Sequence, residues 1–370
     1  MGILKQLLKK ANTFIENNNK AEQEEIKSDS DDDLKNKLIY GGKDYYNKEQ
    51  VIALFLKSMS YRPHAIGKDN DDYPRYMQYD YKILNVPKFH KELIDEGYFV
   101  VAAFEKVISK YKVDELKRML CMYDVDTKGL KKEALLSLVN EKTNSDLKDE
   151  IVKQSGLYEL SEKGFDYLES NKEFLTVVNE FKKFGITYLL FTEYRKKLPL
   201  YLKTRDVAWE ILNEKLNYYT IHNSFDGART IYLYMAEFLQ EEKENIDVLY
   251  YYIVCLYYDV NLSNTQEMLM NEYSSKETIL ECIDANPIVP GIYKTINELS
   301  CYHDDKIYEK LFSYQFMPYK FISDDDFKKM VSDIYNSSFF ESDKYVNGII
   351  ANAKKIIEEK AVKQTKYRKY

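Results

Sequence analysis

Residues 112–142 have the sequence KVDELKRMLCMYDVDTKGLKKEALLSLVNEK, and they contain the clearest structural pattern in the 370-residue chain. In both halves of this stretch, apolar residues recur at the spacing of one helix face. Gly129 lies between the halves and favours a tight loop, because glycine adopts positive φ angles at little cost. The stretch therefore predicts a hairpin of two short amphipathic helices joined by a loop.

Basic residues gather on the loop and the helix ends of this hairpin. They are Lys112, Lys117, Arg118, Lys128, Lys131 and Lys132. The start of a helix has free N–H groups and the positive end of the helix dipole, so it attracts phosphate. The pattern indicates nucleic acid as the partner. Seven basic and six acidic residues give the stretch a net charge of only +1, so a positive surface depends on how the fold sorts them.

Calcium is a second hypothesis for the loop. Asp124, Asp126 and Gly129 match positions 1, 3 and 6 of an EF-hand loop. Position 5 is Lys128, however, and position 12 is Leu135, where an EF-hand requires a bidentate Glu. Because two carboxylates beside an ammonium group do not complete the oxygen cage, no metal site is expected here.

The composition predicts a folded, mainly α protein. Hydrophobic residues make up 45% and charged residues 31% of the chain, and 12 Gly and 7 Pro leave few places where helices must stop. Its length of 370 residues predicts two domains. The formal net charge of −7 argues against a protein that coats nucleic acid through bulk charge. Any contact with nucleic acid must therefore be a local patch.

Four segments are expected along the chain. Residues 1–17 form a separate amphipathic helix, since residues 1–15 (MGILKQLLKKANTFI) have an apolar stripe opposite lysines. This helix either docks on a protein partner or a membrane surface, or packs on its own protein. Residues 18–39 form an acidic linker around EQEEIKSDSDDD. A small α+β domain at 40–171 contains the hairpin, and an irregular helical bundle at 172–370 follows.

Two stretches predict strands in the α+β domain. In PKFHKELIDEGYFVVAAF, a helical pattern stops at Gly97 and a β-favouring run follows at 98–101. GLYELSEKGFDYLESN, at 156–171, has a short strand before a helix. That strand either pairs with 98–101 or leads into the last helix of a winged-helix domain.

About nine helices are predicted from Phe174 to the end of the chain. The 3.6-residue period is clear at Ala208, Ile211, Leu212, Leu216 and Tyr219 and again at Ile231, Tyr234, Met235, Phe238 and Leu239. Ser323 before Asp326 predicts a helix cap. WEILNEKLNYY resembles the first helix of a tetratricopeptide repeat, but no second copy follows at a period of about 34 residues. A partner-binding solenoid is therefore the alternative to an irregular bundle.

The four cysteines predict a reducing compartment. Cys121, Cys255, Cys282 and Cys301 lie far apart, mostly among apolar residues, without a CxxC pair. They are expected to be reduced, buried thiols in a cytoplasmic protein. No run reaches the roughly 18 to 20 apolar residues that a membrane span needs. The most hydrophobic stretch, VLYYYIVCLYY at 248–258, is expected to be a central core helix.

No enzyme signature is found in the sequence. GxSxG, a phosphate-binding glycine loop and HExxH are missing. His64 and His90 have no carboxylate or Ser partner at a diagnostic spacing, so they are interpreted as structural or surface histidines. Cys301 and His303 lack a second pair that would complete a zinc site. The chain is therefore expected to be no enzyme and to need no cofactor.

The hairpin resembles the SAP motif, a module of helix, extended loop and helix. VDELKRML corresponds to its first helix, Gly129 to its loop glycine, and Lys131 to the basic residue two positions further on. Leu135, Leu138 and Val139 correspond to the apolar face of its second helix. The resemblance implies a helical hairpin that is built to bind a ligand with its loop.

SAP motifs bind DNA, often AT-rich DNA, with the loop and the start of the second helix. The resemblance implies a contact with double-stranded DNA at Lys128, Gly129, Lys131 and Lys132, flanked by Lys117 and Arg118. The sequence departs from the family pattern in the loop, which contains Asp124 and Asp126, and at Ser137, where a basic residue is common.

The order of segments is similar to that of a group of SAP-domain proteins from low-GC Gram-positive bacteria and their phages. The shared features are an amphipathic start, an acidic linker, YPRYMQYDY, HKELIDEGYFV, the hairpin, YELSEKG and a helical tail with NPIVPGIYKTINEL. This resemblance implies no catalytic residues. Two functions stay open: a DNA-binding protein with a helical partner-binding domain, and a helical scaffold of a phage or mobile element in which the hairpin is structural.

Overall fold

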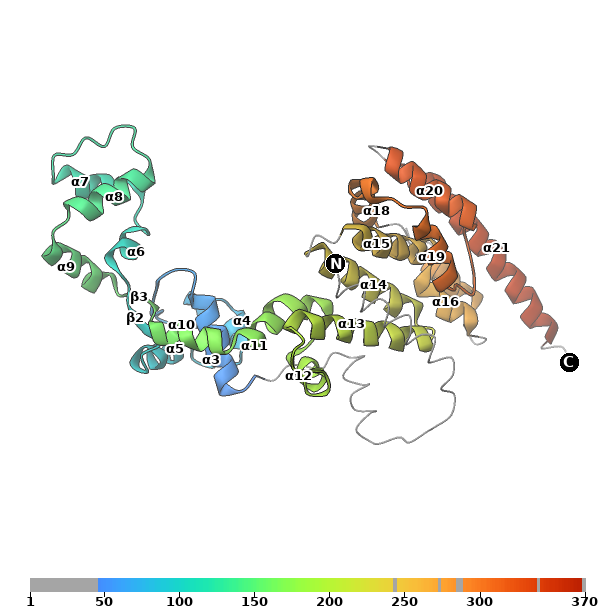
Figure 1. Cartoon of the computed structure of the whole chain (residues 1–370), viewed down its shortest axis with the longest axis horizontal. Helices are drawn as coiled ribbons and strands as arrows, with labels where there is room; N and C mark the ends of the chain where they lie inside the picture. The colour runs from blue at the N-terminus through green and yellow to red at the C-terminus, as the bar shows by residue number, and fades with distance from the viewer. Residues whose placement is uncertain (1–45, 242–244, 272–273, 284–288, 338–339, 368–370) are drawn as a thin grey trace. The chain divides into compact units, whose positions relative to one another are not determined.

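The computed structural model describes residues 46–241, 245–271, 274–283, 289–337 and 340–367, with side chains up to residue 360 except that of residue 245 (Figure 1). The described residues form nineteen helices and one three-stranded sheet, and 71% of the structure is helical. The predicted mainly α fold is therefore confirmed. The amphipathic helix expected at 1–17 and the acidic linker expected at 18–39 lie outside the described residues.

Contacts between residues divide the structure into two compact units. The first lies within Lys43–Ile211 and the second contains Leu212–Tyr370. The division falls inside helix α13 (Thr204–Ile221), beyond the boundary that the sequence suggests between residues 171 and 172. The first unit therefore includes α11 (Lys172–Thr176), which packs on the first helix of the unit through Phe174 and Leu175.

The first unit consists mostly of short elements. Besides α11, its helices are α3 (Lys48–Met59), α4 (Tyr76–Tyr79), α5 (Val86–Asp95), α6 (Phe104–Ile108), α7 (Val113–Cys121), α8 (Lys132–Lys142), α9 (Ser145–Ser155), α10 (Glu162–Ser170) and α12 (Tyr188–Lys197). Its strands are β1 (His64–Ala65), β2 (Phe99–Val101) and β3 (Leu157–Leu160). Short 3-10 or π-helical turns lie at 70–72, 177–181 and 182–184.

The sheet joins three segments that are distant in the sequence. Its strand order is β1-β3-β2, and both pairs are antiparallel, with His64 opposite Tyr158. Gly97 has a φ of +84° and lets the chain turn from the end of α5 into β2. Of the two alternatives for the second strand stretch, the structure has the pairing with 98–101, because β3 pairs with β2.

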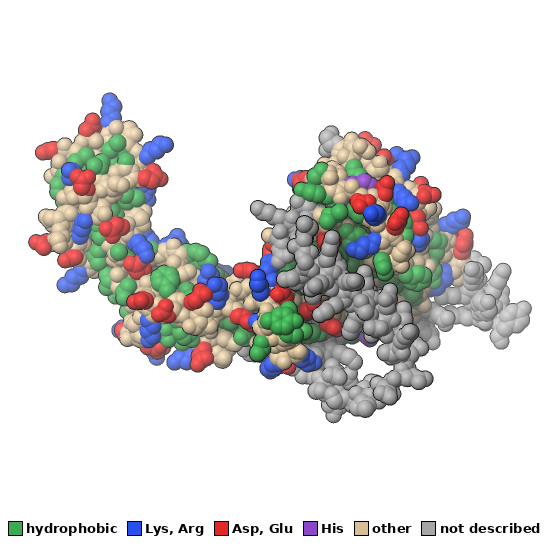
Figure 2. Space-filling view, in the orientation of Figure 1, with side chains coloured by type: hydrophobic (Ala, Val, Ile, Leu, Met, Phe, Trp, Pro, Cys, Tyr) green, Lys and Arg blue, Asp and Glu red, His purple; other side chains and the backbone are tan. Residues whose placement is uncertain are grey.

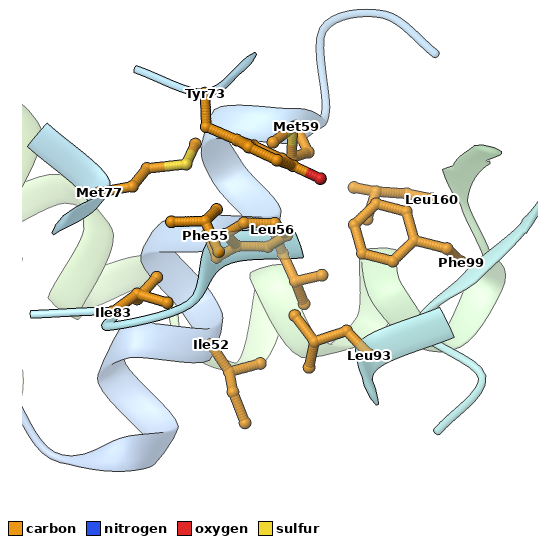
Figure 3. Close-up of a cluster of buried hydrophobic side chains, with 11 residues drawn as sticks. Ile52, Phe55, Leu56, Met59, Tyr73, Met77, Ile83, Leu93, Phe99 and Leu160 are labelled. Carbon is orange, nitrogen blue, oxygen red and sulfur yellow. The ribbon is translucent and has the colours of Figure 1, made fainter. Parts of the chain in front are cut away.

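A first hydrophobic core lies between α3, α5 and the sheet. It consists of Ile52, Phe55, Leu56, Met59, Tyr73, Met77, Ile83, Val86, Leu93, Phe99 and Leu160 (Figure 3). Helix α3 begins with a capping box, in which Asn47 Oδ1 accepts the Gln50 N–H and Gln50 Oε1 accepts the Asn47 N–H. This cap determines where the helix starts, and hence which of its side chains face the core.

A second core holds the hairpin to its neighbour α6. Its buried residues are Phe104 and Ile108 of α6, Leu116 and Leu120 of α7, and Leu135 and Val139 of α8. Burying an apolar side chain of this size contributes roughly 1.5 to 3 kcal/mol. The hairpin is therefore stabilised by the contacts of its two helices with each other and with α6.

In the second unit, eight helices follow α13 within the described residues. They are α14 (Phe225–Gln240), α15 (Asn245–Val260), α16 (Ser263–Met270), α17 (Lys276–Ile283), α18 (Pro290–Glu298), α19 (Lys306–Tyr314), α20 (Asp324–Asn336) and α21 (Asp343–Tyr367). Residues 248–258 of α15 are all buried, as predicted for a core helix. Ser323 caps α20 by accepting the Asp326 N–H at 3.1 Å, which confirms the predicted cap.

The cysteines are free, but they are not all buried. Cys255 is buried and Cys282 is half-buried, whereas Cys121 and Cys301 are exposed. The prediction of buried thiols is therefore wrong for Cys121 and Cys301. Cys121 is the last residue of α7, and Cys301 lies in a short 3-10 turn, so neither stands on an inner helix face.

Candidate nucleic-acid interface

Residues 112–142 fold as a helix, a loop and a helix. Helix α7 begins after Lys112, whose N–H donates to Glu115 Oε2 at 2.6 Å. The loop at 122–131 then leads to α8, and the two helices pack on the second core. The apolar spacing of the sequence thus identifies the inner faces of both helices, which leaves the loop and the polar faces for contact with a ligand.

Two residues with positive φ shape the loop. Gly129 has a φ of +74° and Asp124 has a φ of +53°. The Lys128 N–H donates to Asp126 Oδ1 at 3.0 Å, an Asx turn that engages one carboxylate oxygen with the backbone of the loop. Gly129 lies where the sequence predicts a tight loop, and a side chain at this φ would be strained.

The start of α8 presents free backbone donors. Lys131 is the N-cap residue, its backbone is extended, and its side chain makes no capping hydrogen bond. The Lys131 carbonyl accepts the Leu135 N–H at 3.1 Å, so the N–H groups of residues 132–134 precede the hydrogen-bonded ladder of the helix. These donors and the positive end of the helix dipole favour an anion at this position.

The six residues predicted to contact DNA differ in their accessibility. Arg118, Lys128, Gly129 and Lys131 are exposed, whereas Lys117 and Lys132 are half-buried. Lys132 Nζ donates to the Ser109 carbonyl at 2.8 Å, at the C-terminal end of α6. The structure therefore brings Lys128, Gly129 and Lys131 together at the loop and the start of α8, while Lys117 and Arg118 stand on α7.

Acidic side chains lie among these cations. Asp124, Asp126 and Glu133 are exposed on the loop and on the first turn of α8. Figure 2 shows basic and acidic side chains mixed over the part of the molecule formed by α7, α8 and α9. These three carboxylates therefore oppose the approach of a phosphate group to this surface.

The calcium hypothesis places a ligand at Leu135, and this side chain lies in the second core with 0% exposure. Position 12 of the candidate loop thus faces away from Asp124 and Asp126. Among the described residues, no group of three His, Cys, Asp or Glu side chains is arranged to hold a metal ion.

A second group of basic side chains lies beside the hairpin, and the sequence analysis missed it. Lys110 follows Ser109, the C-cap residue of α6, and its Nζ donates to the Pro63 carbonyl. This contact places the ammonium group next to Arg62 and His64, the two neighbours of Pro63 in the chain. Arg62 and Lys110 are exposed and His64 is half-buried. No local pattern links these residues, because the tertiary fold alone brings residue 110 to residue 63.

The pKa values reflect this proximity. Burial and, after it, the charges of Lys110 and Arg62 together lower the pKa of His64 to about 4. Burial also lowers the pKa of Lys110, and Arg62 adds to the shift. Near pH 7, His64 is therefore neutral, and Arg62 and Lys110 provide the positive charge.

His90 lies in the first core. Its Nδ1 is 2.9 Å from the Tyr73 hydroxyl, which also accepts the Gly67 N–H at 2.9 Å. Burial, followed by the charge of His64, lowers the pKa of His90 to about 4. Since its side chain is fully buried against Phe55 and Phe99, His90 is a structural residue of the core.

No family model, curated protein or solved structure matches this chain. The resemblance to SAP-domain proteins therefore stays a prediction that rests on the residues of the hairpin. Within the described ranges, no helix combines the length and the apolar character needed to cross a membrane.

Proposed function

We propose that this chain is a cytoplasmic, non-enzymatic DNA-binding protein that contacts duplex DNA with its SAP-like hairpin. The observation that carries the proposal is the start of α8, where free N–H groups lie beside the exposed Lys128 and Lys131. A phosphate group at this position would accept backbone hydrogen bonds and face two ammonium groups. The resemblance to the SAP motif supports the same surface.

The charge balance of the chain implies a weak contact. The net charge of the whole protein is −7, so DNA is repelled at long range and attracted only by a local patch. Asp124, exposed on the loop, reduces the local attraction further. Binding is therefore expected at low salt, mainly to the phosphate backbone, with little dependence on base sequence.

A salt titration of DNA binding tests this proposal. In fluorescence anisotropy with an AT-rich duplex, contacts to three or four phosphates would give a plot of log K against log salt with a slope of about −3 to −4. Lys128→Glu/Lys131→Glu is expected to abolish binding, because it reverses two charges beside the free N–H groups. The matched control is Lys91→Glu/Lys182→Glu, at two exposed lysines outside the hairpin.

Two results would contradict the proposal. If the unmodified protein does not bind duplex DNA at low salt, DNA binding is refuted. If the hairpin variant binds as tightly as the control variant, the hairpin is not the contact surface. Circular dichroism of each variant shows whether its fold is intact.

Binding of a protein partner is the second candidate function, and two exposed aromatic residues in the second unit favour it. Tyr314 and Phe316 are 56% and 75% exposed, on either side of the buried Gln315. Gln315 Oε1 accepts the Tyr258 hydroxyl at 2.9 Å, and Gln315 Nε2 donates to the Tyr232 hydroxyl at 2.9 Å. The backbone between the two aromatic residues is thus anchored, and exposed aromatic side chains are typical anchors of protein interfaces.

Affinity capture from the native host separates the two functions. A helical scaffold of a phage or mobile element would retain a protein partner after nuclease treatment and lose it in Tyr314→Ser/Phe316→Ser. A DNA-binding protein would lose its captured partners after nuclease treatment, and the Tyr314 and Phe316 substitutions would not change its affinity for DNA.

A further inference from the structure

Hydrogen bonds connect the hairpin to basic residues near the first core. Lys132, at the start of α8, donates to the Ser109 carbonyl at 2.8 Å. Lys110, which follows Ser109 in the chain, donates to the Pro63 carbonyl, and Arg62 directly precedes Pro63. Three segments that are distant in the sequence are thus joined by their basic side chains. We call Lys132, Lys110 and Arg62 the basic track.

The end of α3 adds one further cation and an aromatic ring to the neighbourhood of the track. Lys57, in the last turn of α3, lies with Nζ 5.2 Å from the centre of the Tyr61 ring. Tyr61 directly precedes Arg62, and its side chain is 76% exposed. The exposed surface beside Arg62 therefore contains a phenol hydroxyl and a second positive charge.

The three cations around Tyr61 and Pro63 are not paired with acidic side chains. Within the described part of the chain, none of Lys57, Arg62 and Lys110 forms an ion pair with a carboxylate. Lys106, one helical turn before Lys110, shows the contrast, because it pairs with Glu159. The charged groups that shift the pKa values of Lys110 and His64 are all basic. Cations that repel one another in this way are stabilised when an anion binds between them.

We propose that Arg62 and Lys110 form a second phosphate-binding surface for the same DNA duplex that the hairpin contacts. The inference rests on the proposed function and extends its contact from the start of α8 along the basic track. The ligand is the phosphodiester backbone, which both exposed side chains can reach without reading a base. Lys57 and the Tyr61 hydroxyl provide further donors beside Arg62.

His64 provides a local reporter of this surface. It is neutral near pH 7, because burial and the two cations oppose its protonation. A bound phosphate would offset the charges of Lys110 and Arg62, so the pKa of His64 is expected to rise when DNA binds. NMR titration of the His64 ring, with and without duplex, measures this change in the full-length protein.

Salt-dependent anisotropy with the full-length protein and an AT-rich duplex tests the second surface. Arg62→Gln/Lys110→Gln is expected to reduce the slope of log K against log salt by about two units, and the affinity at 50 mM salt by roughly tenfold for each lost contact. Arg62→Gln alone keeps the bond between Lys110 and Pro63, and it is expected to reduce the slope by about one unit. Lys91→Gln/Lys182→Gln removes the same charge elsewhere and is expected to leave the slope unchanged.

The outcomes distinguish this inference from the proposed function. If the hairpin variant loses DNA binding while both Arg62 variants keep the wild-type slope, the second surface is refuted and the proposed function stands. If Arg62→Gln reduces the slope and the His64 pKa rises with DNA, the second surface is supported. If the unmodified protein does not bind DNA at low salt, both ideas fall.

Discussion

Gly129 shows how a single backbone angle shapes the candidate interface. Its φ of +74° lies in the left-handed region, and a Cβ atom built at this position meets no atom within 4 Å. Glycine is therefore needed for its φ angle, and not because a side chain would collide with a neighbouring atom. The loop depends on this angle to bring Lys128 and Lys131 to the start of α8.

Substitution of Gly129 tests this conformational requirement. Gly129→Ala is expected to lower the free energy of unfolding by about 1 kcal/mol, because an L residue is strained at positive φ. Gly348→Ala is the matched control: Gly348 also has open space around it but lies inside helix α21, where alanine should add up to about 1 kcal/mol. Urea denaturation measures both changes. Changes of the same sign in both variants would contradict the argument.

At the scale of elements, a buried ion pair joins the two central helices of the second unit. Arg229 of α14 donates to Asp259 of α15 through Nε at 2.8 Å and through Nη2 at 2.9 Å. The two side chains are only 15% and 8% exposed. Such a pair is costly to break, because removing one partner leaves the other charge buried without compensation.

Removal of one partner should therefore strongly destabilise the packing of α14 on α15. Asp259→Ala is expected to lower the free energy of unfolding by about 3 to 5 kcal/mol. Glu92→Ala is the control, because it removes an exposed ion pair with Lys88 and should change stability by less than about 1 kcal/mol. Chemical denaturation measures both variants, and similar effects for the two would mean that burial of the pair is unimportant.

The elements that the sequence predicts correctly are those with a continuous apolar pattern. The hairpin helices and the buried face of α15 follow from local spacing, whereas the pairing of β2 with β3 is one of two alternatives that local spacing leaves open. From Phe174 to the end of the chain the sequence predicts about nine helices, and within the described residues ten helices, α12 to α21, begin in this range. Helices α16 to α19 are only eight or nine residues long, too short to show a full periodic pattern.

Features that depend on tertiary contacts could not be predicted from the sequence. Strand β1 has two residues and no pattern of its own, since it exists only by pairing with β3. The contact of Lys110 with Pro63 joins residues from different elements, so the basic surface beside the hairpin has no local signal. The sequence likewise has no signal for the hydrogen bond from Lys132 to the Ser109 carbonyl. It identifies Lys132 only as a basic residue at the start of a helix.

At the scale of the whole molecule, acid is expected to destabilise the first unit. His64 and His90 both lie in this unit, and burial lowers the pKa of each to about 4. In the unfolded chain a histidine has a pKa of about 6.5 and binds a proton first. The stabilisation by these neutral histidines is therefore complete above about pH 6.5 and is lost as the pH falls toward 4. The shift of His90 corresponds to up to about 3 kcal/mol.

Hydrogen exchange at pH 7.5 and pH 5, corrected for the intrinsic rate, measures this effect by region. Protection within residues 46–211 is expected to fall at the lower pH. In His90→Gln, which keeps a hydrogen-bonding side chain but cannot be protonated, the dependence on pH should become weaker. If protection in the first unit does not change between the two pH values, the buried histidines do not control its stability.

The hydrogen bond between Tyr73 and His90 also links the first core to the loop that follows β1. The Tyr73 hydroxyl accepts the Gly67 N–H and lies 2.9 Å from Nδ1 of His90, so one phenol joins the buried ring to the backbone of the loop. His90 Nε2 is buried and makes no hydrogen bond within the described part of the chain. In acid both ring nitrogens carry a hydrogen, and the buried Nε2–H then has no acceptor, so protonation of His90 favours opening of the contact that holds the loop at 67–73. One imidazole ring would thus transmit protonation from the core to the segment that carries Arg62 and His64.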